Sequence, residues 1–91
     1  MAYYRFIIYG EVQCVYYRKF VSQAMMKKQF KGYIRNLSDG TVEVVAEVFD
    51  DDFENVMKIL NEGSPLSKVK NINYEVVEDV TFRTDGFEIR Q

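Results

Sequence analysis

Hydrophobic positions recur with two different periods, and the changes of period divide the chain into elements. From Tyr3 to Tyr9, aromatic and β-branched residues predict a strand, and both of its faces carry apolar side chains, so we expect it to be central in a sheet. From Tyr17 to Gln29 the spacing becomes helical. An apolar stripe is expected to face the sheet, while the lysines of this segment face water; the stripe comprises Phe20, Val21, Ala24 and Met25.

The middle of the chain is typical of a β-hairpin. Gly32 is expected to end the helical region, and Tyr33 to Leu37 reads as a short strand. Ser38-Asp39-Gly40 supplies a turn signal. Thr41 to Phe49 then alternates, with valines and an alanine predicted to point inward, and Thr41, Glu43 and Glu47 predicted to point outward.

A second helix and two more strands complete the pattern. Asp50, Asp51 and Asp52 are expected to cap a helix whose apolar residues, Phe53, Val56, Met57 and Leu60, recur at helical spacing, and Gly63, Ser64 and Pro65 end it. Val69 to Glu78 predicts a strand, and Asp85-Gly86 turns into a last strand, Phe87 to Arg90. The order β-α-β-β-α-β plus a short C-terminal strand predicts an α+β, ferredoxin-like split βαβ fold, with two helices on one face of a mostly antiparallel sheet.

Composition limits the number of domains and the partners. With 91 residues, 47% hydrophobic and 29% charged, the chain is expected to form a single domain over residues 1–91. The net charge of −2 argues against a nucleic-acid partner. No segment approaches membrane-spanning length and the N-terminus does not resemble a signal peptide, so we expect a cytoplasmic protein without a membrane partner. A single cysteine, Cys14, agrees with a reducing compartment.

The absence of histidine from the sequence excludes several kinds of chemistry. No Ser-His or Cys-His nucleophile pair can form, and a zinc site is not expected with one cysteine as the only sulfur ligand. Only magnesium or calcium held by carboxylates remains as a metal alternative. We expect no metal and no cofactor.

The stretch from Tyr9 to Arg18 connects the first strand to the first helix. Gly10 frees the backbone there, and the N–H groups of the loop and of the helix start favour an anion-binding concavity. Arg18 lies in the first turn, where its planar fork can bind two oxygens of a phosphate or carboxylate. Taken alone, an arginine at this place is about as often a solvated surface residue.

Two motifs together resemble one family. Gly10 to Arg18 is similar to the Gly-x-Val-Gln-Gly-Val-x-(Phe/Tyr)-Arg loop of acylphosphatases, and Gly32 to Glu43 is similar to their hairpin, Gly-aromatic-(Val/Ile)-x-Asn-x-x-Asp-Gly-x-Val-Glu. The length, the order of elements and the Gly-Phe-x-Ile near the end, Gly86 to Ile89, also resemble that family. The resemblance extends over nearly the whole chain.

This resemblance implies an activity and the residues that carry it. The family hydrolyses carboxyl-phosphate bonds of acyl phosphates such as acetyl phosphate to a carboxylate and inorganic phosphate, which is also a competitive ligand. Arg18 matches the arginine that binds the phosphoryl group, and Asn36 matches the asparagine that orients the attacking water. The substrate-binding loop is expected to comprise Gln13, Cys14, Val15, Tyr16, Tyr17 and Arg18, with backbone amides completing the cradle. We expect a monomer.

Cys14 departs from the family pattern, which has a second glycine there. A side chain at this position can obstruct or bend the cradle. Cys14 and Arg18 are too close in sequence for the C-x5-R loop of phosphocysteine enzymes, so an unreactive replacement is favoured over a nucleophilic thiolate. A non-catalytic anion- or metabolite-binding module of the same fold stays an alternative, and an RNA-recognition module is a weaker one because no basic, aromatic face is present.

Overall fold

The computed structural model describes residues 2–83 and 85–90. In chain order the elements are β1 (Ala2–Glu11), α1 (Tyr17–Lys27), β2 (Lys31–Asn36), β3 (Val42–Val48), the 3-10 helix η1 (Asp50–Asp52), α2 (Phe53–Glu62), β4 (Lys68–Val77) and β5 (Phe87–Arg90). The predicted order is confirmed, and the last strand has the predicted bounds.

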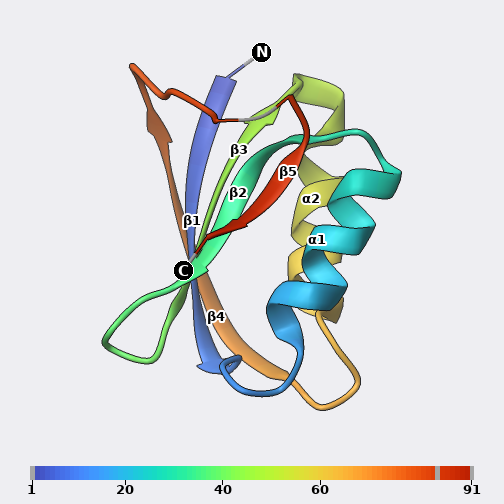
Figure 1. Ribbon diagram of the computed structural model, residues 1–91, viewed down its shortest axis with the longest axis vertical. Helices are drawn as coiled ribbons and strands as arrows, with labels where there is room; N and C mark the ends of the chain where they lie inside the picture. Colours follow the sequence, from blue (N-terminus) through green and yellow to red (C-terminus); the bar gives the residue numbers. More distant parts are fainter. Residues whose placement is uncertain (1, 84, 91) are drawn as a thin grey trace.

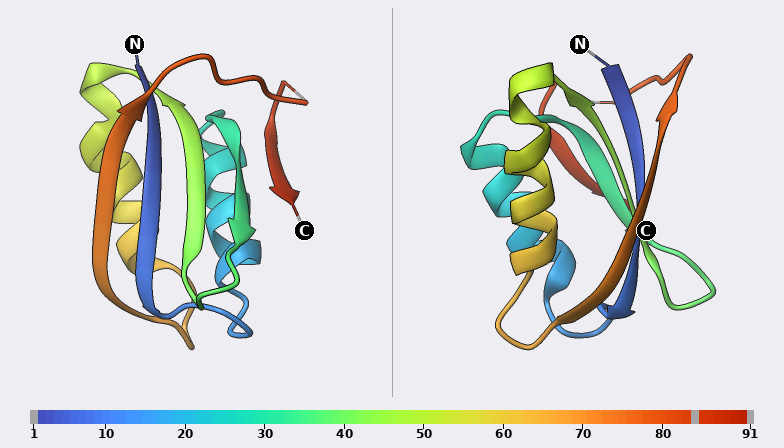
Figure 2. Two further views of the ribbon diagram at one scale, coloured as in Figure 1. Left: turned by 90° about the vertical axis from the view of Figure 1, so that its left-hand side faces the viewer. Right: turned by 180° about the vertical axis from the view of Figure 1, so that it is seen from behind.

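The strands form one sheet in the order β4-β1-β3-β2-β5, with both helices on one face (Figures 1 and 2). β1 pairs with β3 and β4, so it is an interior strand as predicted. Neighbouring strands are antiparallel except β2 and β5, which are parallel. The arrangement is the ferredoxin-like α+β fold, with a mixed sheet. Its consequence for function is that β5 lies beside β2 and close to α1.

The core lies between the sheet and the two helices. Phe6 and Ile8 of β1, Met25 of α1 and Leu60 of α2 are fully buried there. Each such side chain stabilises the fold by about 1.5–3 kcal/mol relative to an exposed position. This packed layer fixes where the two ends of α1 lie relative to the sheet.

The first helix differs from its prediction in two ways. Phe20 is 41% exposed, whereas Tyr17, Val21 and Met25 are buried, so the prediction that Phe20 faces the sheet is wrong. The buried stripe is rotated because the Tyr17 ring enters the core at the helix start. The helix also ends at Lys27, two residues before the predicted Gln29, and Gln29 has a left-handed φ of 62°.

Other corrections concern polar residues and Gly32. Gly32 lies inside β2, where a Cβ would come within 2.1 Å of the Val45 carbonyl oxygen. Glu43 was expected to point outward into water, but it is only 2% exposed because two arginines cover it on the face of the sheet away from the helices. Asp50 to Asp52 form η1 and their side chains make no capping hydrogen bond; Asp52 has φ −105° and ψ −3°, not the extended backbone of a usual cap.

No helix in the described part of the chain is long and apolar enough to cross a membrane.

Candidate active site

The path from β1 into α1 begins at a β-bulge. The pairing of β1 with β4 shifts register between Tyr9 and Gly10, and Gly10 has a φ of 132°. A Cβ at Gly10 would lie 2.1 Å from the Lys68 carbonyl oxygen, so both the backbone angle and the close approach require glycine here. Gly10 thus lies one residue before the end of the strand and bends the chain toward the loop.

The loop has an alternating backbone that leaves its amides free. Cys14 and Tyr16 are left-handed, with φ of 59° and 63°, and Val15 between them is not. A left-handed residue is one half of the paired conformation whose successive N–H groups form an anion-binding nest. Among the described residues, no acceptor is hydrogen-bonded to the N–H groups of residues 13–16. The first turn of α1 follows directly, and its N–H groups have no partners within the helix.

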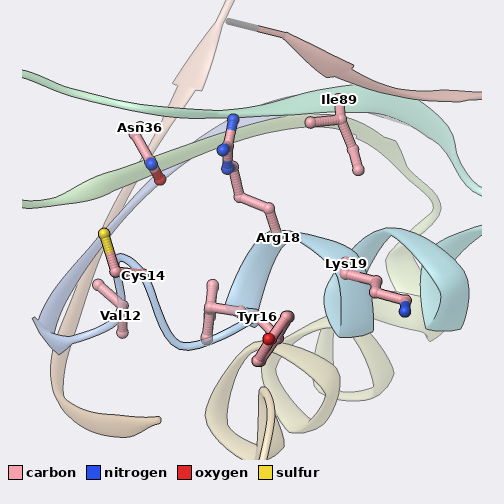
Figure 3. A pocket seen from close by; sticks show the side chains of 8 residues that line it. Val12, Cys14, Tyr16, Arg18, Lys19, Asn36 and Ile89 are labelled. Atoms are coloured by element: carbon pink, nitrogen blue, oxygen red, sulfur yellow. The ribbon is translucent and has the colours of Figure 1, made fainter.

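This loop forms one wall of a pocket of about 380 Å³. The loop and the start of α1 contribute most of the lining: Val12, Cys14, Tyr16, Tyr17, Arg18 and Lys19. Asn36 at the end of β2 and Ile89 of β5 complete it (Figure 3). None of the described residues in this lining carries a carboxylate, so within the described part of the chain no negative side chain offsets the guanidinium of the pocket.

Arg18 reaches across the pocket toward the strand that carries Asn36 (Figure 3). Its Nη1 donates to the Arg90 carbonyl oxygen of β5, with a nitrogen–oxygen distance of 3.1 Å. Among the described residues, Arg18 forms no ion pair with a carboxylate. The β5 backbone therefore orients the guanidinium without neutralising it, and the remaining N–H donors are available to an anion.

Asn36 lines the pocket as the last residue of β2. Its Oδ1 is buried and has no hydrogen-bond partner in the described part of the chain. Buried polar atoms are normally paired, so an unpaired acceptor beside an anion pocket needs a functional explanation. The following turn is held by Asp39, whose Oδ1 accepts from the N–H and the hydroxyl of Thr41 at 3.0 and 2.6 Å.

Three loop residues have side chains engaged elsewhere. Gln13 donates from Nε2 to the carbonyl oxygens of Leu37 and Thr41, both at 2.8 Å, so it ties the loop to the β2–β3 turn. The Val15 side chain packs against the core and does not line the pocket. The Tyr17 hydroxyl donates to the Leu60 carbonyl oxygen at 2.6 Å, and burial raises the pKa of this phenol well above its ordinary value. Because these side chains point elsewhere, Gln13 and Val15 can contact an anion only through their backbone N–H groups.

The structure adds three lining residues that sequence reasoning did not place at the site: Val12, Lys19 and Ile89. Ile89 is 71 residues after Arg18, and no local pattern joins the two. The predicted topology could have indicated Ile89. When a strand is added to a split βαβ sheet, it must pair at an edge of the sheet, near one of the helices. Lys19 was predicted to face water, and it is exposed at the rim of the pocket.

The fold and the loop define the class: a small ferredoxin-like α+β protein with an anion pocket between its first loop and its sheet. A family model described as acylphosphatase matches residues 4–89. The curated acylphosphatase of Bacillus licheniformis is 38% identical over 88 residues, which cover 97% of this chain and 93% of that protein. The acylphosphatase of Haloarcula marismortui is 40% identical over 83 residues, which cover 89% and 87%.

A solved structure gives the same result. The crystal structure of acylphosphatase from Bacillus subtilis matches with a TM-score of 0.88 and 32% identity, and the match covers 100% of both chains. The chain belongs to the acylphosphatase family. At this level the predictions of a ferredoxin-like fold and of a hydrolase of acyl phosphates are confirmed; the roles of individual residues stay predictions.

Proposed function

We propose that this chain hydrolyses the carboxyl-phosphate bond of acyl phosphates in the pocket between Arg18 and Asn36. One observation carries the residue assignment. A guanidinium without an ion pair, the unbonded amides of Cys14 and Tyr16 and an Oδ1 of Asn36 without a partner, all judged among residues 2–83 and 85–90, belong to the same small pocket. The first two bind a phosphoryl group, and the third is an acceptor for water.

Arg18 and the loop amides hold the phosphoryl group. In phosphoryl transfer, negative charge is spread over the equatorial oxygens, so donors fixed before the reaction stabilise the transition state without reorganising. Arg18 is fixed by the Arg90 carbonyl, and the amides are fixed by the left-handed backbone at Cys14 and Tyr16. No covalent intermediate is needed.

Asn36 orients the attacking water. Its Oδ1 accepts a hydrogen bond from the water, whose oxygen attacks phosphorus in line with the leaving group. A phosphorus–oxygen bond to water forms while the bond to the acyl oxygen breaks, and the carboxylate departs with the electron pair. The amide is no base, so the proton of the water passes to an oxygen of the substrate phosphate. A carboxylate is a weakly basic leaving group, so no general acid is required.

The proposal also covers the substrate, the partners, the oligomeric state and the compartment. The substrate is a small acyl phosphate, inorganic phosphate is the product and a competitive ligand, and no nucleic acid or membrane takes part. Residues 1–91 act as a single acylphosphatase-like domain and as a monomer. We place it in the cytoplasm, in support of which the only cysteine of the sequence, Cys14, is free and exposed.

The test is phosphate release from acetyl phosphate and benzoyl phosphate by the purified protein and two variants. Arg18→Ala should weaken binding of inorganic phosphate and abolish turnover, because the main charge that holds the phosphoryl group is gone. Asn36→Ala should lower kcat by roughly 100-fold or more while phosphate binding changes little, since the water and not the phosphate loses its partner. The ratio of the two effects separates binding from water orientation.

Two outcomes would contradict this proposal. A protein that binds phosphate but releases none from either substrate is a binding module with the same fold, which is the alternative function. An Asn36→Ala kcat within about twofold of the wild type shows that Asn36 does not orient the nucleophile.

A further inference from the structure

The pocket is larger than its phosphate-binding part requires. Its volume of about 380 Å³ falls within the range of roughly 300–1,000 Å³ of sites that enclose whole small molecules. Arg18, Asn36 and the loop amides account for the phosphoryl group and the water. The rest of the lining is available to the acyl group of the substrate.

Two apolar side chains that line the pocket are partly exposed. Tyr16 at the end of the loop is 65% exposed, and Ile89 of β5 is 44% exposed. They come from segments far apart in the sequence and line the same cavity. Exposed apolar side chains that gather at a cavity mark a ligand contact more often than scattered ones do.

The backbone of Tyr16 strengthens the argument. Its φ of 63° is left-handed, a conformation that is uncommon for any residue with a side chain and rarer for a bulky one. Tyr16 makes no side-chain hydrogen bond and no ring contact among the described residues. The left-handed backbone places the loop amides, and the exposed ring, which has no partner among the described residues, is therefore available to contact a ligand in the pocket.

We propose that Tyr16 and Ile89 determine substrate specificity by binding the acyl group, and that this chain prefers acyl phosphates with an aromatic or branched apolar acyl group to acetyl phosphate. The inference rests on the proposed function and adds its substrate class. The acyl carbon is attached to the phosphoryl group held by Arg18, so an apolar acyl group extends along the lining toward the two side chains. Burying it there removes apolar surface from water on both partners.

The experiment compares kcat/KM for benzoyl phosphate with that for acetyl phosphate in the wild type, Tyr16→Asn and Ile89→Ala. Asparagine removes the ring and tolerates the left-handed backbone, and Ile89 is exposed enough for truncation to spare the fold. Phe20→Ala is the matched control, because Phe20 is an apolar residue about as exposed as Ile89 and close to Tyr16 in the sequence, and it does not line the pocket. Comparing the ratio between proteins cancels the difference in leaving-group reactivity of the two substrates.

We expect each pocket variant to lower the benzoyl-to-acetyl ratio by about tenfold, the lower end of the roughly 10–200-fold that one group in an apolar pocket is worth. Phe20→Ala should leave it within twofold, and inhibition by inorganic phosphate should be unchanged in Ile89→Ala and Phe20→Ala. Ratios within twofold of the wild type in both pocket variants would overturn the proposal. A wild type that prefers succinyl phosphate to benzoyl phosphate would also overturn it, because Lys19 would then select the acyl group by charge.

A binding measurement keeps this inference separable from the proposed function. Benzoylphosphonate and acetylphosphonate carry a carbon–phosphorus bond in place of the hydrolysable one, so their competition with inorganic phosphate reports acyl binding without turnover. Weaker benzoylphosphonate binding in Tyr16→Asn and Ile89→Ala supports the acyl site even if the wild type hydrolyses nothing. Equal binding of both phosphonates by an active wild type refutes the acyl site alone.

Discussion

Cys14 shows how one residue can carry opposing energetic effects. Its φ of 59° is left-handed, at the position where the family motif has glycine, and for a residue with a side chain this conformation costs of order 1–2 kcal/mol. Glycine would remove that strain but would also lose about 0.5–1 kcal/mol through the greater freedom of the unfolded chain. The two effects nearly cancel in stability, so the change should be visible mainly in activity.

We therefore expect Cys14→Gly to stay within about 1 kcal/mol of the wild type in unfolding free energy and to keep or raise kcat/KM. Cys14 lines the pocket beside Arg18, so an alkyl adduct on its sulfur should block turnover of the wild type. Iodoacetamide treatment of Cys14→Gly is the control and should have no effect. Inactive Cys14→Gly and Cys14→Ser proteins that still fold and bind phosphate would show that the sulfur takes part in the reaction.

Gln13 connects the loop to the hairpin that follows Asn36, and we propose that it is a positioning residue. Its two hydrogen bonds to the carbonyl oxygens of Leu37 and Thr41 join the loop that we propose binds the phosphate to the hairpin that we propose positions the water. Displacing catalytic groups by about 1 Å can cost about 100-fold in rate. We expect Gln13→Leu to lower kcat by about 10–100-fold while the affinity for inorganic phosphate changes less.

Gln23→Leu serves as the control for this substitution, because Gln23 is exposed on α1 and forms no side-chain hydrogen bond among the described residues. It should keep the wild-type kcat. A Gln13→Leu protein with normal kcat would show that the loop and the hairpin are held together by their other contacts.

Among the elements, β3 carries a buried charge that its alternation does not predict. Glu43 accepts hydrogen bonds from the Nε atoms of Arg5 and Arg35, which come from the strands on either side of it. Burial alone would raise the pKa of Glu43, but the hydrogen bonds from the two arginines outweigh it and lower the pKa below its ordinary value. The three side chains connect β1, β3 and β2 on the face away from the helices.

The sign of this shift fixes a pH dependence. Because the pKa of Glu43 is lower in the folded than in the unfolded chain, its contribution to stability is present above the unfolded value of about 4.3 and is lost as the pH falls through the folded value. Glu43→Gln should lower the unfolding free energy by about 1–3 kcal/mol at pH 7, since the arginines keep water contacts. The difference from the wild type should shrink below about pH 4.5.

Denaturant unfolding at several pH values measures this difference. Glu47→Gln on the same strand and face is the control, because Glu47 forms no ion pair in the described part of the chain, and it should change stability by less than about 0.5 kcal/mol. A Glu43→Gln deficit that is the same at pH 3 and pH 7 would mean that packing, and not the charge, is what was lost.

In the proposed mechanism, Arg18 and the loop amides stabilise the negative charge of the transition state without a metal ion. Among residues 2–83 and 85–90, none that lines the pocket is a carboxylate, and no group of three or more His, Cys, Asp or Glu side chains could hold a metal ion. We expect kcat with acetyl phosphate to stay within twofold in excess EDTA, measured as phosphate release. Activity that is lost in EDTA and restored by magnesium would contradict the assignment to Arg18 and the amides.

The features that could be predicted from the sequence alone are local ones. The strand and helix periods, the Asp39-Gly40 turn and the glycine-containing loop before Arg18 depend on interactions between residues close in the chain, so they could be predicted, and the family motifs added Asn36. Two predicted boundaries were wrong. The helix α1 ends at Lys27, before the left-handed Gln29, and Gly32 lies inside β2.

Tertiary structure decided which of these local features meet. Only the pairing of β5 beside β2 brings Ile89 and the Arg90 carbonyl to the loop, and only the register of β1, β2 and β3 buries Glu43 between two arginines. The exposure of Phe20 and the unpaired Oδ1 of Asn36 likewise depend on how helix, sheet and loop pack. The physical reason is that burial and side-chain partners are set by contacts between segments distant in sequence, which no periodicity within one segment can encode.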